Sequence, residues 1–321
     1  MTRNNRALTG LLLAGLLAGG VIALLKTGLY GWTTFVLVPV LLGGIASWTF
    51  RAESGARGAG LGALGAAAAA YSLMTFKVEG LICVMMALPL VMPLGALGGW
   101  MAYLVERAAS RARGIAMLLI LPLPPSSILW DVEARPPVFA VRTTIEIAAP
   151  AQRVWKNVVT YSELPTPREW FFHAGVAYPT RARIDGSGIG GTRYCDFTTG
   201  QLVEPIEVWD EPHLMRFRVT QNPAPMREWS PYGELTPKHL NGYLVSEHGQ
   251  FRLIPLPNGH TLLEATTWYR HGLWPAEYWR WWSDAIIHRI HLLVITHIRA
   301  LSENDLSAPC AELHANCDSR R

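Results

Sequence analysis

Long uncharged stretches separated by short charged loops fill the first part of the chain. Residues 7–25 and 30–50 each approach the ~20 apolar residues that a helix needs to cross a bilayer. Residues 58–76, rich in Gly and Ala, and residues 80–105, which contain two prolines, continue the pattern. The pattern therefore predicts a transmembrane helical region over residues 1–135.

Residues 114–130 are apolar as well, but they are short for a span and contain three prolines. The loops on one side of the predicted membrane carry only Lys26 and Lys77. The loops on the other side, with the N-terminus, carry Arg3, Arg6, Arg51, Arg57, Arg107, Arg111 and Arg113. By the positive-inside rule we expect a cytoplasmic N-terminus and five spans, which put the rest of the chain outside the cytoplasm. If residues 114–130 are a re-entrant or interfacial segment, there are four spans and the rest of the chain lies inside the cytoplasm.

The chain is 50% hydrophobic and only 16% charged, which is unusually apolar for a water-soluble enzyme. Its formal net charge of +4 does not indicate nucleic-acid binding, because the positive excess lies between the hydrophobic runs. The second half offers no long Lys/Arg cluster for phosphate contacts. We expect an integral protein of a bacterial inner membrane that binds no nucleic acid.

Polar and apolar residues begin to alternate after Pro136 and Pro137, over residues 138–148, as in a β-strand. Pro150 then opens an amphipathic helix that runs to about residue 161. Further alternating runs, separated by turn residues, predict strands over 181–185, 192–198, 201–209, 213–220, 243–255 and 260–271.

The last predicted strand gives way at Pro275 to a helix of about 25 residues that ends near Leu301. An antiparallel sheet can curl around such a helix and leave an apolar hollow between the two, which is a natural ligand cavity. Residues 303–321 form a polar tail that we expect to be disordered. The second half is thus predicted to form one domain over residues 138–302.

Three motifs and the long last helix carry a resemblance to a known family. The motifs are Thr144-Ile-Glu-Ile-Ala-Ala-Pro-Ala-Gln-Arg-Val-Trp, Gly190-Gly-Thr-Arg-Tyr and Glu207-Val-Trp-Asp-Glu-Pro. With them, residues 138–302 resemble the START-like or SRPBCC helix-grip superfamily, in its polyketide cyclase/dehydrase and lipid-transport branch. The resemblance implies an α+β fold with a curved antiparallel sheet around a long C-terminal helix. The hydrophobic pattern, and not the resemblance, predicts the all-α transmembrane bundle of four or five helices that precedes this fold. The resemblance also implies a pocket for a hydrophobic ligand, and only some members catalyse a reaction.

Candidate ligand contacts follow from the alternation of side chains along the predicted strands and from the periodicity of the last helix. They are Met215, Phe217, Val219, Phe251, Leu253, Thr267, Tyr269, His271, Trp282, Ile286, Ile290 and His297. Core packing is an equal interpretation for any single one of them. Residues 222–241 are longer than the usual hairpin and are a candidate lid.

The sequence contains no Ser/His/Asp order, Cys/His pair or close carboxylate pair that stands out as catalytic. If acid–base chemistry occurs, His271, Tyr269 and His297 are the candidates, because a carbonyl substrate in an apolar pocket needs a hydrogen-bond donor. For His297, a hydrogen-bonded core histidine is the favoured interpretation.

Asp284, His288 and His291 share one face of the last helix, as metal ligands can. The predicted apolar stripe puts them on the solvent or membrane-surface side; it consists of Trp279, Trp282, Ile286, Ile290, Leu293 and Leu301. We therefore expect no metal and no cofactor. Two GxGxxG matches, at residues 60–65 and 186–191, are interpreted as small residues for helix packing and as a hairpin turn, because neither lies between a strand and a helix.

The sequence predicts membrane-tethered binding of a hydrophobic small molecule or lipid, with the bilayer as the other partner. The alternative is a cyclase/dehydrase-type enzyme that acts on a membrane-soluble polyketide- or isoprenoid-like substrate. A transporter or sensor is a third hypothesis, and it is weakened because the predicted spans contain no buried ion pair.

Overall fold

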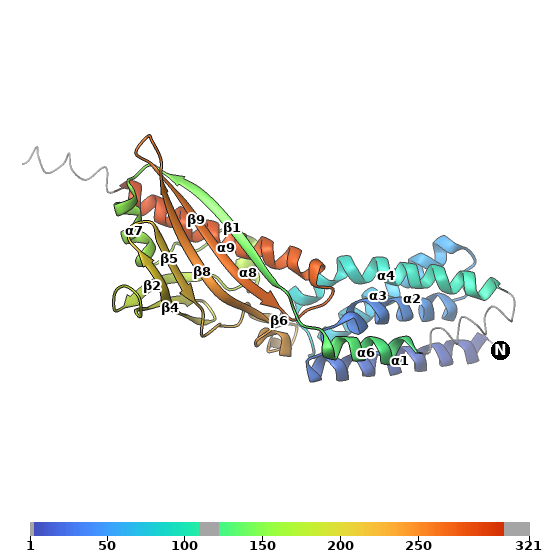
Figure 1. Ribbon diagram of the computed structural model, residues 1–321. Helices are drawn as coiled ribbons and strands as arrows, with labels where there is room; N and C mark the ends of the chain where they lie inside the picture. The colour runs from blue at the N-terminus through green and yellow to red at the C-terminus, as the bar shows by residue number, and fades with distance from the viewer. Residues whose placement is uncertain (1–2, 109–121, 305–321) are drawn as a thin grey trace, which may run out of the picture. The chain divides into compact units, whose positions relative to one another are not determined.

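The computed structural model describes residues 3–108 and 122–304 of the chain, which divide into two compact units (Figure 1). The first unit holds the helices before Val138 together with two later stretches, Arg227–Tyr243 and His271–Trp279. The second unit holds Val138–Met226, Leu244–Arg270 and the chain from Arg280 onward. Two stretches from the second half of the sequence therefore pack with the helices of the first half.

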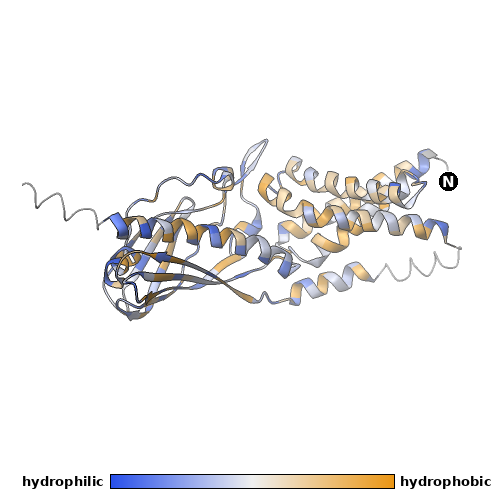
Figure 2. Ribbon diagram, turned by 90° about the horizontal axis from the view of Figure 1, so that it is seen from above, coloured by the Kyte–Doolittle hydropathy of each residue, from blue (hydrophilic) through white to orange (hydrophobic). Residues whose placement is uncertain are grey.

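The first unit consists mainly of apolar helices (Figures 1 and 2). They are α1 (Arg3–Thr27), α2 (Val38–Thr49), α3 (Gly55–Thr75), α4 (Leu81–Arg107) and α6 (Leu123–Glu133). A π-helical turn, η1 (Thr33–Leu37), leads into α2. Two short strands, β6 (Glu228–Ser230) and β7 (Gly233–Leu235), and the 3-10 turn η2 (Lys238–Leu240) belong to the same unit.

Glycines allow α2, α3 and α4 to pack backbone against backbone. A methyl group added to Gly62 of α3 would collide with the carbonyl oxygen of Gly95 in α4, and so would one added to Gly43 of α2. Gly60 of α3, by contrast, has open space beside it. Close helix packing, the predicted role of the first GxGxxG match, is therefore confirmed for Gly62.

Three helices in the described part of the chain are long and apolar enough to cross a membrane, by length and composition: Asn4–Thr27, Leu81–Arg107 and Ala276–Asn304. The apolar helix over Thr33–Thr49 is shorter. These helices are compatible with a membrane protein. The prediction for residues 114–130 lies partly outside the described residues, and the predicted tail lies outside them from residue 305 on.

A seven-stranded antiparallel sheet forms the body of the second unit, in the order β1-β9-β8-β5-β4-β3-β2. Its strands are β1 (Val138–Ile147), β2 (Pro179–Asp185), β3 (Thr192–Phe197), β4 (Gly200–Asp210), β5 (Leu214–Arg218), β8 (Leu244–Pro255) and β9 (Thr261–His271). Two helices, α7 (Ala151–Val159) and α8 (Trp170–Ala174), follow β1, and α9 (Ala276–Asn304) follows β9. Each predicted strand is found within a few residues of its expected range, and the second GxGxxG match is the turn between β2 and β3.

The core of the second unit lies between the sheet and α9 (Figure 1). Leu263 of β9 and both Ile295 and Ile298 of α9 are fully buried there, and burial of each such side chain contributes roughly 1.5–3 kcal/mol. Pro150 stands directly before α7, as predicted, and Val154 of α7 joins the same core. A sheet curled around a long C-terminal helix is the helix-grip arrangement, so the predicted fold class is confirmed.

The buried face of α9 differs from the predicted apolar stripe. It consists of Ile287, His291, Val294, Ile295, Ile298 and Ser302. The expectation that His291 faces solvent or the membrane surface is therefore wrong. The predicted apolar stripe begins at Trp279, but Trp279 belongs to the first unit. The Trp-rich start of α9 therefore does not indicate which face of the helix meets the sheet.

Candidate ligand-binding site

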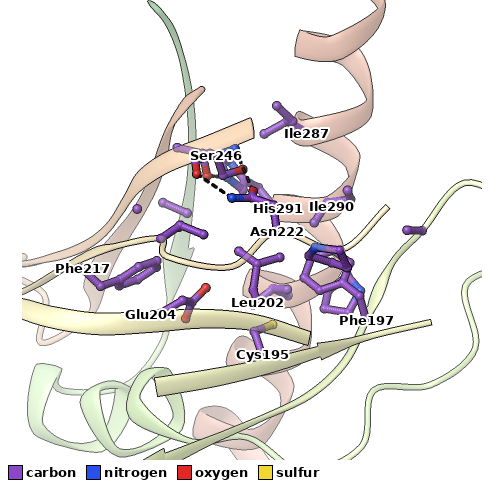
Figure 3. A pocket seen from close by; sticks show the side chains of 18 of the residues that line it. Cys195, Phe197, Leu202, Glu204, Phe217, Asn222, Ser246, Ile287, Ile290 and His291 are labelled. Carbon is purple, nitrogen blue, oxygen red and sulfur yellow. Dashed lines mark hydrogen bonds between the residues drawn. The ribbon is translucent and has the colours of Figure 1, made fainter. Parts of the chain in front are cut away.

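A cavity lies in the second unit between α9 and the sheet (Figure 3). The space inside it that the centre of a water molecule can reach measures about 160 Å³. Its walls come from β3, β4, β5, β8 and β9, from α9, and from a loop over residues 222–226. The cavity occupies the position at which a sheet curled around a helix leaves a hollow.

Apolar side chains form most of the cavity wall. They include Phe217 of β5, Phe251 of β8, and Ile286 and Ile290 of α9. Gly249 of β8 is the register partner of Phe217, and the Phe217 ring covers the place where a Cβ atom on Gly249 would stand. The glycine thus leaves room for the ring against β8.

One buried ion pair interrupts the apolar wall. Arg193 of β3 and Glu204 of β4 are register partners, and the Arg193 Nη1 atom donates a hydrogen bond to the Glu204 Oε2 atom. Their side chains are only 2% and 5% exposed. The Arg193 guanidinium lies 5.5–5.7 Å from the ring centres of Tyr161, Phe217 and Phe251, within the range of cation–π attraction.

The ion pair is weak evidence for stability. A buried ion pair is often no more stabilising than apolar side chains of the same volume. The Arg193 Nε atom, moreover, has no hydrogen-bond partner among the described residues. Burial raises the pKa of Glu204 above the usual carboxyl value, and Arg193 acts against this rise. The pair therefore offers a polar group of a ligand one cationic donor beside an acidic group.

Tyr161 and Cys195 stand beside this pair on the cavity wall. The Tyr161 hydroxyl and the Cys195 Sγ atom lie 3.3 Å apart. Burial raises the pKa of the Cys195 thiol to about 12 and raises the pKa of Tyr161 well above its usual value. Both groups are therefore neutral at ordinary pH, and Cys195 is not a thiolate nucleophile.

His291 connects the cavity wall with β1 and β9. Its Nε2 atom lies 2.8 Å from the Thr267 hydroxyl, and its Nδ1 atom lies 3.1 Å from the Thr143 hydroxyl. Burial lowers the pKa of His291 to about 4, and the neighbouring His288 contributes in the same direction. The imidazole is therefore neutral near pH 7 and acts through hydrogen bonds. Asp284 does not join the two histidines, because it accepts a hydrogen bond from the Tyr269 hydroxyl at 2.6 Å.

Six of the twelve predicted ligand contacts line the cavity: Phe217, Val219, Phe251, Thr267, Ile286 and Ile290. The other six do not belong to its wall: Met215, Leu253, Tyr269, His271, Trp282 and His297. Met215 and Leu253 are buried in the hydrophobic core beside the cavity. The three candidate acid–base residues are thus not gathered at the cavity, and a role in ligand binding stays a prediction for all twelve.

The predicted lid is divided between the two units. Residues 222–226 line the cavity. The Asn222 side chain accepts a hydrogen bond from the Ser246 backbone N–H at 2.9 Å and donates one to the Ser246 carbonyl oxygen at 3.1 Å (Figure 3). From Arg227 on, the segment packs in the first unit. Only the start of the predicted lid therefore contacts the cavity.

Sequence reasoning missed Arg193 and Glu204 as site residues. Both lie on strands that the sequence predicts. Only the strand register, however, shows that the two side chains stand opposite each other on the same face of the sheet. The available signal was the alternation of Arg193, Cys195 and Phe197 on one face of β3. Because Tyr194 on the opposite face is also a strong candidate for burial, this alternation does not select the inner face.

Comparisons with known proteins find one family and several solved structures that are similar to part of this chain. A sequence model of the family "Polyketide cyclase / dehydrase and lipid transport" matches residues 138–271. A point mutant of norcoclaurine synthase from Thalictrum flavum, solved with a transition state analogue, is 12% identical, with a TM-score of 0.36 over 54% of this chain and 99% of that chain. The Zhui aromatase/cyclase from Streptomyces sp. R1128 is 14% identical, with a TM-score of 0.35 over 54% of this chain and 98% of that chain. A comparison with curated proteins found no match.

The strand order and the position of α9 define the second unit as a helix-grip fold, and the family match lies over residues 138–271. The family match does not extend to the helices of the first unit.

Proposed function

We propose that the protein binds a hydrophobic small molecule or lipid in the cavity of its helix-grip domain, and that its apolar helices tether this domain to a bilayer. The observation that carries the proposal is the apolar cavity between α9 and the sheet. Largely apolar hollows with a few convergent polar groups are typical of small-molecule sites. The description of the matching family, which includes lipid transport, supports the same function.

The ligand of this proposal carries one polar group. A buried donor without a partner costs about 1–3 kcal/mol, and the Arg193 Nε atom is such a donor. A carbonyl, carboxylate or phosphate oxygen on an otherwise apolar molecule would satisfy it. The aromatic rings around the guanidinium would then cover the remainder of the ligand.

Extraction of the full chain, purified in detergent, followed by mass spectrometry of the extract tests this proposal. The full chain is required because Arg227–Tyr243 and His271–Trp279 pack with the helices. Ala265→Leu puts three extra carbon atoms into the cavity, and the recovered ligand should fall about tenfold. Ala140→Leu, at an exposed position of β1, is the matched control. Equal recovery of the same molecules from wild type and Ala265→Leu would overturn the proposal.

A cyclase/dehydrase-type reaction is the second candidate, and the raised pKa of Glu204 favours it. In its protonated form, a carboxyl group at this position can act as a general acid. Arg193 beside it can stabilise negative charge on a carbonyl oxygen. If Glu204 assists the loss of water, Glu204→Gln should retain a molecule that is heavier than the wild-type ligand by one water. An identical ligand in both proteins favours binding without reaction.

The path of the chain through the first unit supports five membrane crossings. At one end of the helices, Arg6 of α1 donates a hydrogen bond to the Glu106 carboxylate of α4 at 2.5 Å. At the other end, the Trp32 backbone N–H donates one to the Asp131 carboxylate of α6 at 2.7 Å. Glu106 and Asp131 therefore lie at opposite ends, and in this proposal the chain crosses the bilayer between them. With the arginine-rich ends of the helices in the cytoplasm, the helix-grip domain lies outside it.

A reporter fused after Arg321 tests the topology. A phosphatase that is active only outside the cytoplasm should be active in this fusion. Activity of a cytoplasm-specific reporter instead would contradict five crossings and favour four.

A further inference from the structure

A cluster of polar side chains is buried in the first unit. It joins Glu79, which lies between α3 and α4, to Cys83 in the first turn of α4 and to His239 of η2. Their ligand atoms all lie within 4.8 Å of one another. Glu79 and His239 are only 5% and 6% exposed. A carboxylate, a thiol and an imidazole therefore converge on one small buried space.

The contacts within the cluster leave two polar atoms unsatisfied. The Cys83 Sγ and His239 Nε2 atoms lie 2.8 Å apart, and the His239 Nδ1 and Glu79 Oε2 atoms lie 3.3 Å apart. Neither Glu79 Oε2 nor His239 Nδ1, however, forms a hydrogen bond with the described residues. Each unsatisfied buried atom costs about 1–3 kcal/mol. When the ring proton of His239 is on Nε2, the His239 Nδ1 atom and the Glu79 Oε2 atom are both electron-pair donors without an acceptor, and they lie beside a thiol.

Neighbouring groups orient the cluster. The Tyr30 hydroxyl donates a hydrogen bond to the Glu79 Oε1 atom at 2.7 Å, which leaves Oε2 free to face His239. Glu228 of β6 accepts hydrogen bonds from the backbone N–H groups of Ile82 and Cys83, at 3.2 and 3.0 Å, at the N-terminus of α4. Outer contacts of this kind fix the direction of ligand side chains in metal sites.

We propose that Glu79, Cys83 and His239 bind a zinc ion. Thiolate, imidazole and carboxylate are the three ligand types that zinc takes from proteins, and its bonds of ~2.0–2.3 Å put tetrahedral ligand atoms about 3.5 Å apart. The observed cluster needs only small side-chain adjustments to reach that spacing. The thiol argues against magnesium and calcium, which prefer oxygen ligands. Binding releases the thiol proton of Cys83 to solvent and leaves one position on the ion for water.

The ion joins parts of the chain that are far apart in the sequence. Glu79 and Cys83 flank the start of α4, whereas His239 follows Cys83 by 156 residues. The zinc site therefore holds the stretch Arg227–Tyr243 to the start of α4, where Glu228 already contacts the helix.

The test uses the full chain, purified in detergent with an affinity tag that contains no histidine. Elemental analysis should find about one zinc ion per chain, and cobalt in its place should give the absorption of a tetrahedral site with thiolate-to-metal charge transfer. Cys83→Ser and His239→Ala should each weaken zinc affinity at least about 100-fold. His173→Ala, which changes an exposed histidine of α8, is the matched control and should keep the wild-type affinity.

Hydrogen exchange provides a second readout. Removal of zinc by a chelator should increase exchange over residues 228–240 and leave the core strand around Leu263 unchanged. A folded wild-type chain that holds no zinc and gives no cobalt charge-transfer band overturns the proposal, and so does full zinc retention by Cys83→Ser. Because the cobalt spectrum is measured on the wild-type chain, misfolding of a variant cannot hide the result.

Discussion

Arg193 and Glu204 face each other across β3 and β4 and form an ion pair that is almost completely buried. Three aromatic rings lie close to the Arg193 guanidinium. The Glu204 side chain is only 5% exposed, so water does not solvate its charge. Removal of one partner leaves the other charge buried and uncompensated, whereas removal of both leaves an apolar wall. The single variant should therefore lower the stability much more than the double variant does.

Glu204→Leu should lower the free energy of unfolding by about 3–5 kcal/mol, because it leaves the Arg193 charge buried without a partner. The double variant Arg193→Met, Glu204→Leu should regain most of this loss and yet retain no ligand. Urea titrations in detergent and extraction with mass spectrometry measure the two effects. Arg181→Met, which breaks the partly exposed pair with Asp196, is the control and should cost no more than about 1 kcal/mol. A double variant as unstable as Glu204→Leu would contradict the expected compensation.

Gly249→Ala should weaken ligand binding through Phe217. A methyl group at position 249 would collide with the Phe217 ring, so the ring should move into the cavity that it lines. We expect a stability loss of about 1–3 kcal/mol together with lower ligand recovery. The double variant Gly249→Ala, Phe217→Leu removes the ring and should restore ligand recovery. If Gly249→Ala alone retains the wild-type amount of ligand, the ring does not border the bound molecule.

His291 should make the stability of the helix-grip domain dependent on pH. The pKa of His291 is about 4 in the folded chain, against an ordinary value of 6.5. Between these values the unfolded chain binds a proton that the folded chain does not, so stability falls as the pH drops below about 6.5. From about pH 7 to about pH 5 this loss should approach about 2 kcal/mol.

The comparison with His291→Gln isolates this contribution, because glutamine can still form hydrogen bonds with Thr143 and Thr267 but does not titrate. Urea titrations of both proteins over this pH range measure it. An equal pH dependence in wild type and variant would show that another group is responsible.

The limits of the sequence prediction follow from what each pattern depends on. Strand alternation is local, and it predicted β4 as 201–209 against the observed Gly200–Asp210. The buried face of α9 was misassigned because Trp279 at its start packs in the first unit, whereas Ile287, His291 and Val294 meet the sheet. A helical wheel assumes one environment along the helix, and α9 has two.

The candidate sites depend on contacts that no local pattern contains. The pairing of Arg193 with Glu204 requires the strand register. The cluster around Cys83 requires His239, which was predicted to belong to a lid over the cavity. Half of the predicted ligand contacts did reach the cavity wall, because strand alternation and the helical period were sufficient for Phe217, Phe251 and Ile290.

Substitutions of the glycines of α3 should separate close helix packing from helix propensity. Gly62→Val should destabilise the helix bundle, because its side chain would collide with the carbonyl oxygen of Gly95. Gly60→Val lies two residues away on the same helix, with open space beside it, and has the same intrinsic effect on helix formation. Thermal unfolding in detergent should show a loss of about 1–3 kcal/mol for Gly62→Val relative to Gly60→Val. Equal stability of the two variants would show that α3 and α4 do not pack through these glycines when the chain is in detergent.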